Sequence, residues 1–363
     1  MNAATGHWVA PANAPARRWA AGLTLAALAV TLGAAVVVAL GIGAYRIPAP
    51  EVLRILLGVF GDAATDDQAT AVLTTIRAPR VVLAVLTGAG LAVAGALTQG
   101  LFRNPLADPA LVGVSAGAAL AAAMVIVLGN VWLPASMRVD AMGPYVLPIA
   151  AFGGSLAVTA IVYRIGLAHG VLSLPLTLLA GIAINAIALA GVGLLIFVAN
   201  DEQLRTLTFW NLGSLAAGSW RALLLVLPLV VVAIAYALRL APALNALALG
   251  EAQAEYLGVD VDRTKRLAIV LAALATGSLV ALTGVIGFVG LVAPHLVRLA
   301  CGPDHRVVLP GSALLGALLV VLADLLARTV VVPAELPLGI VTALAGGPFF
   351  LFLLLRTRWI KGT

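Results

Sequence analysis

Residue types that carry enzyme chemistry are sparse in this chain, and they form no familiar catalytic pattern. There are two lysines, Lys265 and Lys361, and neither follows a glycine, so the sequence lacks the glycine-lysine pair of a phosphate-binding P-loop. The metalloprotease pattern H-E-x-x-H and the nucleophile pattern G-x-S-x-G do not occur either. The one cysteine, Cys301, can form neither an internal disulfide nor a cysteine metal cluster. We therefore expect no catalytic residue, no metal site and no cofactor in this chain.

Ionisable residues within apolar stretches are the next candidates, because carriers driven by protons or sodium usually hold a carboxylate or a histidine near the middle of the membrane. Asp324 comes nearest, but it precedes Arg328 by four residues, a spacing that favours a local ion pair on one helix. We expect His295 to be structural, and His169 and His305 to be solvated in loops. If this chain moves a solute across a membrane, the energy must then come from another protein, or the chain is a passive channel.

The amino-acid composition indicates whether this protein lies in water or in a membrane. Of its 363 residues, 63% are hydrophobic and 10% are charged, and the mean hydropathy is +1.12. A soluble domain is about half apolar and about a quarter charged. The apolar runs are continuous rather than alternating, which indicates membrane helices instead of a β-barrel. The composition therefore excludes a soluble enzyme, a disordered chain and a secreted disulfide scaffold.

The charge balance is basic, with a formal net charge of +6 and an isoelectric point of 10.1. The basic residues are scattered at the expected helix ends and are not clustered with aromatic residues, so we expect no nucleic-acid partner. With the N-terminus inside, the inner loops and tails hold 13 basic and 6 acidic residues, whereas the outer ones hold 8 and 9. Basic residues are enriched on the cytoplasmic side of membranes, so we expect both termini to be cytoplasmic.

The apolar runs predict the spans. Residues 1–18 are expected to form a disordered cytoplasmic tail. The run 19–43 exceeds the core of a signal peptide, which is about 7–15 residues, and therefore predicts a retained membrane anchor. Further runs occur at 81–102, 110–129, 145–163, 171–199, 222–240, 308–327 and 336–355.

The run 267–300 is too long for one upright crossing and short for two. Glycines break its second half, so we expect one full span and one short span, with a re-entrant segment over 284–300 as the alternative. The expected fold is all-α: a polytopic membrane protein of about ten transmembrane helices. These helices form one permease-like domain over 19–359, followed by a short cytoplasmic tail, 360–363.

Three polar segments join the spans. The outer segment 44–77 predicts a short amphipathic helix over 51–59, and the outer segment 200–221 predicts a short helix beside the membrane, with acidic residues near its start that suit the helix dipole. The inner segment is 241–266. Small residues are abundant within the spans, and we expect them to serve close helix packing.

Five stretches together resemble the iron-complex and cobalamin class of permeases from ABC importers, the FecCD type. The resemblance covers about residue 20 to the C-terminus and rests on GAGLAVAG (88–95), QGLFRNPLADP (99–109), GVIGFVGLVAPHLVR (284–298), GPDHR (302–306) and ELPLGIVTALAGGPFF (335–350). It implies a type II importer permease in a bacterial inner membrane. It also implies a homodimer, two ATPase subunits that hold the ATP and Mg²⁺, and a periplasmic substrate-binding protein.

The resemblance further implies that part of segment 241–266 is a cytoplasmic coupling helix that seats in the ATPase, where the alternative is an ordinary cytosolic loop. Two glycines bracket this acidic stretch. The residues expected to couple are Leu249, Gly250, Glu251, Glu255, Leu257 and Gly258.

Three further sets of residues follow from the resemblance. Arginines at the outer ends of spans are expected to dock the binding protein, where the alternative is contact with lipid phosphate: Arg77, Arg80 and Arg328. Two inner loops are expected to narrow the cytoplasmic exit, where the alternative is turn chemistry: Asn104 and Leu106, and Ser173 and Leu174. A smooth face within 171–199 is expected to line the substrate path: Gly181, Asn185 and Ala188.

The overall likeness is to heme-uptake permeases of proteobacteria, so the expected cargo is an iron complex, with heme first, ferric siderophores second and cobalamin third. Two other classes stay open. A secondary carrier would need an essential mid-membrane carboxylate, for which Asp324 is the candidate. A membrane scaffold or enzyme without transport would not co-isolate with an ATPase.

Overall fold

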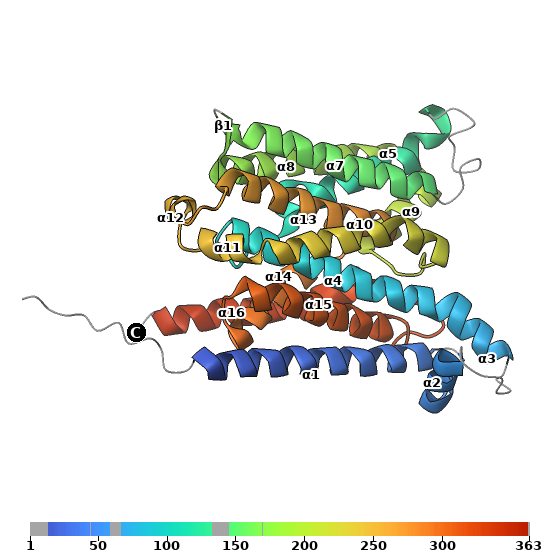
Figure 1. Ribbon diagram of the computed structural model, residues 1–363. Coiled ribbons are helices and arrows are strands. Elements are labelled where there is room, and N and C mark those ends of the chain that lie inside the picture. The colour runs from blue at the N-terminus through green and yellow to red at the C-terminus, as the bar shows by residue number, and fades with distance from the viewer. Residues whose placement is uncertain (1–13, 44, 59–66, 133–144, 169, 362–363) are drawn as a thin grey trace, which may run out of the picture.

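The computed structural model describes residues 14–43, 45–58, 67–132, 145–168 and 170–361, and the fold is a bundle of long helices (Figure 1). Within these residues, seven helices are long and apolar enough to cross a membrane and three shorter apolar helices accompany them, which agrees with the expected number of about ten. The ten are α1 (Ala14–Gly41), α4 (Ala78–Leu101), α5 (Val114–Trp132), α7 (Val146–Gly166), α8 (Leu174–Val198), α10 (Trp220–Arg239), α13 (Val261–Thr283), α14 (Val289–Cys301), α15 (His305–Ala327) and α16 (Leu338–Lys361).

Short elements mark the two ends of the bundle (Figure 1). The outer end, named for the side on which the sequence predicts it, carries α2 (Ala49–Leu57), α3 (Asp67–Ala71) and α9 (Asp201–Leu212), with the π-helix η2 (Val72–Arg77) leading from α3 into α4. The inner end carries the hairpin of β1 (Leu167–Ala168) and β2 (Val171–Leu172), together with α11 (Ala241–Leu247) and α12 (Glu251–Tyr256). A 3-10 helix, η3 (Pro109–Val112), lies between α4 and α5. Helix α1 begins and α16 finishes at the inner end.

Helix α4 is the centre of the bundle, and most of its side chains are buried. It packs against α13, α14 and α15. The approach is close because glycines meet backbone to backbone: a Cβ on Gly95 would lie 2.7 Å from the Cα of Gly290. Close helix contact through small residues is the usual way to pack helices in lipid, where the hydrophobic effect does not drive association.

The ambiguous run 267–300 forms one full span and one short one. Helix α13 finishes at the outer end, where the backbone N–H of Ser214 donates to the carbonyl of Thr283 (2.7 Å). Helix α14 finishes at the inner end, where Asn245 of α11 donates to Asp304 (2.6 Å). The 13 residues of α14 span about 20 Å, and the non-helical residues 284–288 cover the remainder. The segment 284–301 therefore crosses the bundle, and the re-entrant alternative is wrong.

Element boundaries differ from the predictions mainly near the chain ends. Helix α1 begins at Ala14, so residues 14–18 of the predicted tail are helical, while residues 1–13 lie outside the described residues. Helix α16 continues to Lys361, and residues 362–363 also lie outside the description. The two predicted short outer helices are confirmed as α2 and α9, and α9 begins with a reciprocal capping box between Asn200 and Gln203.

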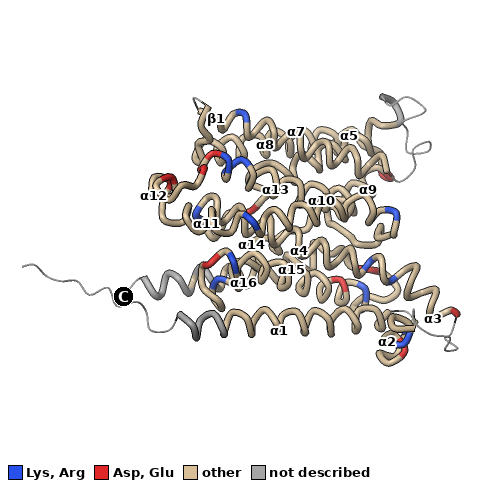
Figure 2. The backbone as a smooth tube through the Cα atoms, viewed as in Figure 1, with Lys and Arg blue, Asp and Glu red and all other residues tan. Residues whose placement is uncertain are grey.

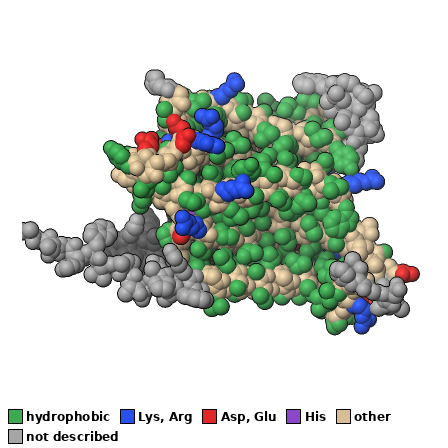
Figure 3. All heavy atoms as spheres, in the orientation of Figure 1, with side chains coloured by type: hydrophobic (Ala, Val, Ile, Leu, Met, Phe, Trp, Pro, Cys, Tyr) green, Lys and Arg blue, Asp and Glu red, His purple; other side chains and the backbone are tan. Residues whose placement is uncertain are grey.

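Charged residues gather toward the two ends of the bundle, and few lie along its middle (Figure 2). Figure 3 shows that hydrophobic side chains cover the visible middle face. Such a band is what a membrane requires of the surface that it contacts.

Candidate functional site

The predicted coupling segment contains a short helix that is held to the protein by one side and exposes the other. Helix α12 lies between Gly250 (φ +125°) and Gly258 (φ +81°), both in backbone conformations that favour glycine. Ala254 is completely buried against the body of the protein. The outward-facing side of this segment exposes the polar Gln253 and Glu255. It also exposes three large side chains on α12 or directly beside it: Leu249 (67%), Tyr256 (91%) and Leu257 (65%). The sequence analysis did not single out Tyr256, whose only sequence signal was an aromatic residue within a short polar helix.

Lys265, one of the basic residues counted on the inner side in the charge balance, is 2% exposed on α13. Its ammonium lies 2.6 Å from Oε2 of Glu251 at the start of α12. It also donates to the backbone carbonyl of Leu172 in β2 (3.2 Å). This lysine therefore contacts both α12 and the hairpin that precedes α8.

The two predicted gate loops meet at one pocket of about 500 Å³ on the inner end. Its lining includes Arg103 from the first loop, Ser173 and Leu174 from the second, and the ion pair of Glu251 and Lys265. Asn104 and Leu106 follow Arg103 in the first loop but do not line the pocket. The side-chain oxygen of Asn104 accepts from the N–H of Leu106 (2.9 Å) and forms a turn. The structure thus brings the loops together, and a gating role for them stays a prediction.

The outer arginine Arg77 is not a surface residue. It is 5% exposed, and its guanidinium donates to the carbonyls of Leu40 (2.7 Å) and Gly41 (3.0 Å) and to that of Tyr45. These carbonyls lie at and beyond the C-terminal end of α1, where helix carbonyls lack partners within the helix. The structure corrects the docking prediction for Arg77, because its donors are used inside the chain.

Arg80 and Arg328 share one buried carboxylate. Asp324, 2% exposed, accepts from Nη2 (2.8 Å) and Nε (3.0 Å) of Arg80, and its other oxygen lies 3.4 Å from Nε of Arg328. Arg80 also pairs with the half-exposed Glu335 (2.9 Å). The expected i,i+4 pair is present, but the shorter contacts of Asp324 are with Arg80 on another helix. Arg328 also donates to the carbonyl of Ala39, so both arginines, like Arg77, have partners inside the chain. Docking by Arg80 and Arg328 stays a prediction, and it requires these internal contacts to be exchanged.

The predicted path-lining face of α8 is covered by the chain itself. A Cβ on Gly181 would collide with the carbonyl of Leu111, and Ala188 is 2% exposed. The side-chain amide of Asn185 donates to the carbonyl of Ala110 in η3 (2.9 Å). The structure corrects this prediction: Gly181 and Asn185 contact η3, and Ala188 is buried within the chain. Other sides of α8 are exposed, and they include Ile182 and Phe197.

His305 is also buried rather than solvated, with 5% exposure. Its ring Nδ1 and backbone N–H both lie 2.9 Å from the side-chain oxygen of Asn245. The neighbouring Asp304 caps α15 by accepting from the N–H of Arg306 (2.9 Å). Burial raises the pKa of Asp304, but the hydrogen bonds from Arg306 and Asn245 outweigh it, so that pKa lies below the ordinary value. This cluster joins α11 to α15.

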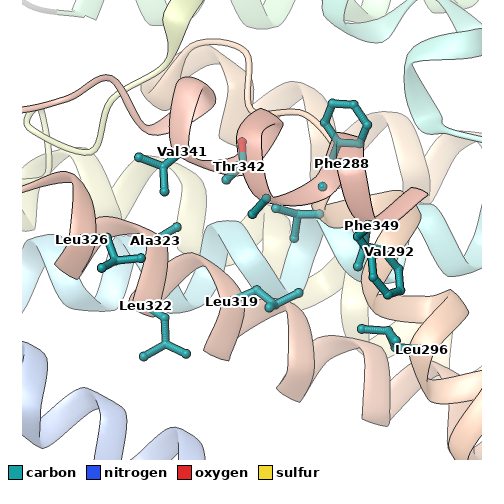
Figure 4. Close-up of a pocket in the computed structure, with 13 residues that line it drawn as sticks. Phe288, Val292, Leu296, Leu319, Leu322, Ala323, Leu326, Val341, Thr342 and Phe349 are labelled. Carbon is teal, nitrogen blue, oxygen red and sulfur yellow. The ribbon is translucent and has the colours of Figure 1, made fainter. Parts of the chain in front are cut away.

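An apolar groove of about 320 Å³ lies between α14, α15 and α16 (Figure 4). Thr342 is the one lining residue with a polar side chain, so the groove offers no charged group for chemistry. In the part of the chain that the structure describes, no three His, Cys, Asp or Glu residues come close enough to hold a metal ion. The described residues thus form packed helices with a pocket at the inner end and large exposed side chains on and beside α12.

Comparison with known proteins agrees with this architecture. Residues 30–356 match the FecCD transport family. The hemin transport system permease protein HmuU of Yersinia pestis is 47% identical over 298 residues, 82% of this chain and 87% of that protein. The cobalamin import system permease BtuC of Halobacterium salinarum is 44% identical over 81% of this chain and 76% of its own length. The Fe(3+)-citrate import system permease YfmE of Bacillus subtilis is 37% identical over 92% of this chain and 94% of its own length.

A solved inward-facing structure of a metal-chelate type ABC transporter superposes with a TM-score of 0.79 at 32% identity, covering 92% of this chain and 98% of that one. Fold and relatives together define a membrane permease, the transport subunit of an ABC importer, in which a separate subunit hydrolyses ATP. The chain belongs to the FecCD transport family.

Proposed function

We propose that this permease imports an iron complex across a bacterial inner membrane and that its cargo is heme. The observation that carries the proposal is the 47% identity to a permease named for hemin transport, over 82% of this chain. Heme is flat and largely apolar, and it is anionic at its propionates. A helical conduit without a metal-ligand cluster among its described residues suits passage of such a cargo without tight binding.

The test is reconstitution with the partner ATPase and binding protein in proteoliposomes. Heme, ferric citrate, a ferric siderophore and cobalamin are supplied separately, and ATP turnover and accumulation are measured. Heme is expected to raise both. An ATPase that lacks its P-loop lysine should abolish accumulation. Stimulation by cobalamin or by a ferric complex without any response to heme would transfer the assignment to that cargo, and uphill transport without the ATPase would indicate a secondary carrier.

The ATPase is proposed to seat on α12 at the cytoplasmic end. Large apolar side chains exposed beyond the membrane commonly mark protein contacts. Tyr256 of α12 and the flanking Leu249 and Leu257 are exposed in this way. Leu257→Ala is expected to reduce co-purification of the ATPase severalfold. Leu57→Ala is the matched control, because Leu57 is equally exposed (65%) but lies on α2 at the outer end. If both variants retain the ATPase equally, the coupling assignment is wrong.

The remaining parts of the proposal concern assembly. The chain is proposed to act as a homodimer. Both of its termini are proposed to lie in the cytoplasm, which the distribution of basic residues supports. The exposed side of α8 that includes Ile182 is proposed to line the path between the two copies. The loops with Asn104 and Ser173 narrow its inner exit, and Arg80 and Arg328 face the binding protein. Cysteine cross-linking between two copies at Ile182, which is 58% exposed, tests the dimer. A monomer in the assembled importer would overturn it.

A further inference from the structure

Lys265 is buried at the inner end of the bundle, and it lies between two elements that are far apart in sequence. A buried ammonium is costly unless it is paired and hydrogen-bonded. Here it has a carboxylate oxygen of Glu251 at 2.6 Å and the carbonyl oxygen of Leu172 at 3.2 Å. Its neighbours on α13, Arg263 and Arg266, are exposed.

The first contact lies on the proposed coupling helix. Glu251 is the first residue of α12 and directly follows Gly250, the conformationally unusual residue at which the chain turns into the helix. The face of α12 that holds Ala254 packs on the body of the protein, whereas the opposite face is exposed and can contact a partner. A partner that shifts α12 therefore also shifts the carboxylate that Lys265 holds.

The second contact lies beside the inner pocket. Leu172 is the last residue of β2, and Ser173 and Leu174 follow it directly into α8. The Leu172 side chain is 3% exposed and packs in a cluster with Leu101 of α4 and Ala268 of α13. Movement of the Leu172 backbone is thus transmitted to the start of α8 and to the loop that follows α4.

We propose that Lys265 is a positioning residue that ties α12 to the β1–β2 hairpin, so that displacement of the coupling helix by the ATPase opens or closes the inner pocket. The inference rests on the proposed coupling role of α12. It assigns the connection to one side chain: of the groups that line the pocket, Lys265 is the one that bonds both elements.

Removing the ammonium should break the link while the fold survives. In Lys265→Met the apolar stem keeps its packing, and Glu251, whose side chain is 39% exposed, can be hydrated by water. One carbonyl, that of Leu172, loses a donor. The matched control is Arg266→Met, the adjacent exposed base on the same helix. Lys265→Arg keeps the charge and the reach, and is expected to restore function.

The experiment uses the complete importer in lipid bilayers, with ATPase and binding protein present. The first readout is the cargo transported per ATP hydrolysed. The second is the distance between spin labels at Val171 and Arg103, two exposed positions beside the pocket, with and without ATP. For Lys265→Met we expect about a tenfold lower transport per ATP, a change within the usual range of coupling between two sites, and loss of the ATP-driven distance change. Arg266→Met should retain both.

Lys265→Met with a normal transport ratio and a normal distance change would overturn the proposal, as would an equal loss in Arg266→Met. If Lys265→Met does not fold, Glu251→Gln breaks the same ion pair and is judged by the same two readouts. Failure of the coupling role itself is distinguishable, because Leu257→Ala would then retain the ATPase. Loss of the ATPase in Leu257→Ala with normal coupling in Lys265→Met would reject the link alone.

Discussion

Gly88 of α4 and Gly316 of α15 lie backbone against backbone, so that a Cβ on Gly88 would be 2.6 Å from the Cα of Ala317. The obstructing atoms belong to the main chain of a packed helix, which cannot rotate away as a side chain could. This contact lies within the pair of helices that pack most extensively in the bundle. It sets how closely the central helix approaches its neighbour.

Gly88→Ala should therefore destabilise the protein although alanine favours helix. Overpacking of this kind costs about 1–3 kcal/mol, and the thermal unfolding temperature in detergent is expected to fall. Gly153→Ala on α7 is the control, because nothing lies within 4 Å of its added Cβ. The packing interpretation fails if the two alanine variants unfold at the same temperature.

The buried carboxylate of Asp324 is predicted to be structural. Asp324→Ala leaves Arg80 and Arg328 without their shared partner, and breaking a buried pair in this way costs about 3–5 kcal/mol. Glu335→Ala removes a 43% exposed partner of Arg80 and should cost about 1 kcal/mol or less. Thermal unfolding of both variants measures the difference. A stable Asp324→Ala protein that has lost only transport would instead favour the carrier hypothesis.

Arg77 is predicted to stabilise the outer end of α1 rather than to bind a partner. Arg77→Met removes the side-chain donor to the carbonyl of Leu40 and leaves that of Gly41 with the N–H of Ile47 alone, at a cost of about 2 kcal/mol. Affinity for the binding protein, measured on the folded fraction, should stay unchanged. Arg54 on α2 is an exposed arginine of the same outer region, so Arg54→Met should change neither the stability nor the affinity for the binding protein. A selective loss of binding-protein affinity in Arg77→Met would restore the docking role.

The cap at the start of α15 gives a pH dependence. The pKa of Asp304 is lowered in the folded state, so its contribution is complete above the unfolded pKa of about 3.9 and disappears as the pH falls through the folded value. Asp304→Ala should lower stability by about 1 kcal/mol at neutral pH. The difference in unfolding temperature between the wild type and Asp304→Ala should be constant from about pH 8 to 5 and should decrease below about pH 4. A difference that increases on acidification would contradict a lowered pKa of Asp304 in the folded state.

Much of the fold could be read from apolar periodicity and length. The runs that became α7, α8 and α15 are close to their predicted bounds, because a span must be long and apolar whatever it packs against. The short outer helices α2 and α9 were also predicted, the second from acids at its start. The break at Gly284 was visible, but which end of the bundle each half reached depended on contacts with Ser214 and Asn245.

The candidate site, like the fold, could be predicted from the sequence only in part. The glycines at 250 and 258 predicted a short inner helix, and α12 is that helix. Sequence could not tell which charges are solvated: Lys265, Arg77 and His305 are all buried. Nor could it tell which face of α8 is open, since small residues such as Gly181 serve equally for a smooth wall and for close packing.

The sequence by itself determined that the protein lies in a membrane, the positions of most of its spans, and its family, because apolar length and ordered motifs are local properties of the chain. The tertiary structure alone decided the partners of the charged residues. A buried charge is stabilised by whichever opposite charge or carbonyl the packing brings within hydrogen-bond distance, and Arg80 with Asp324, or Lys265 with Leu172, come together only when distant helices are packed.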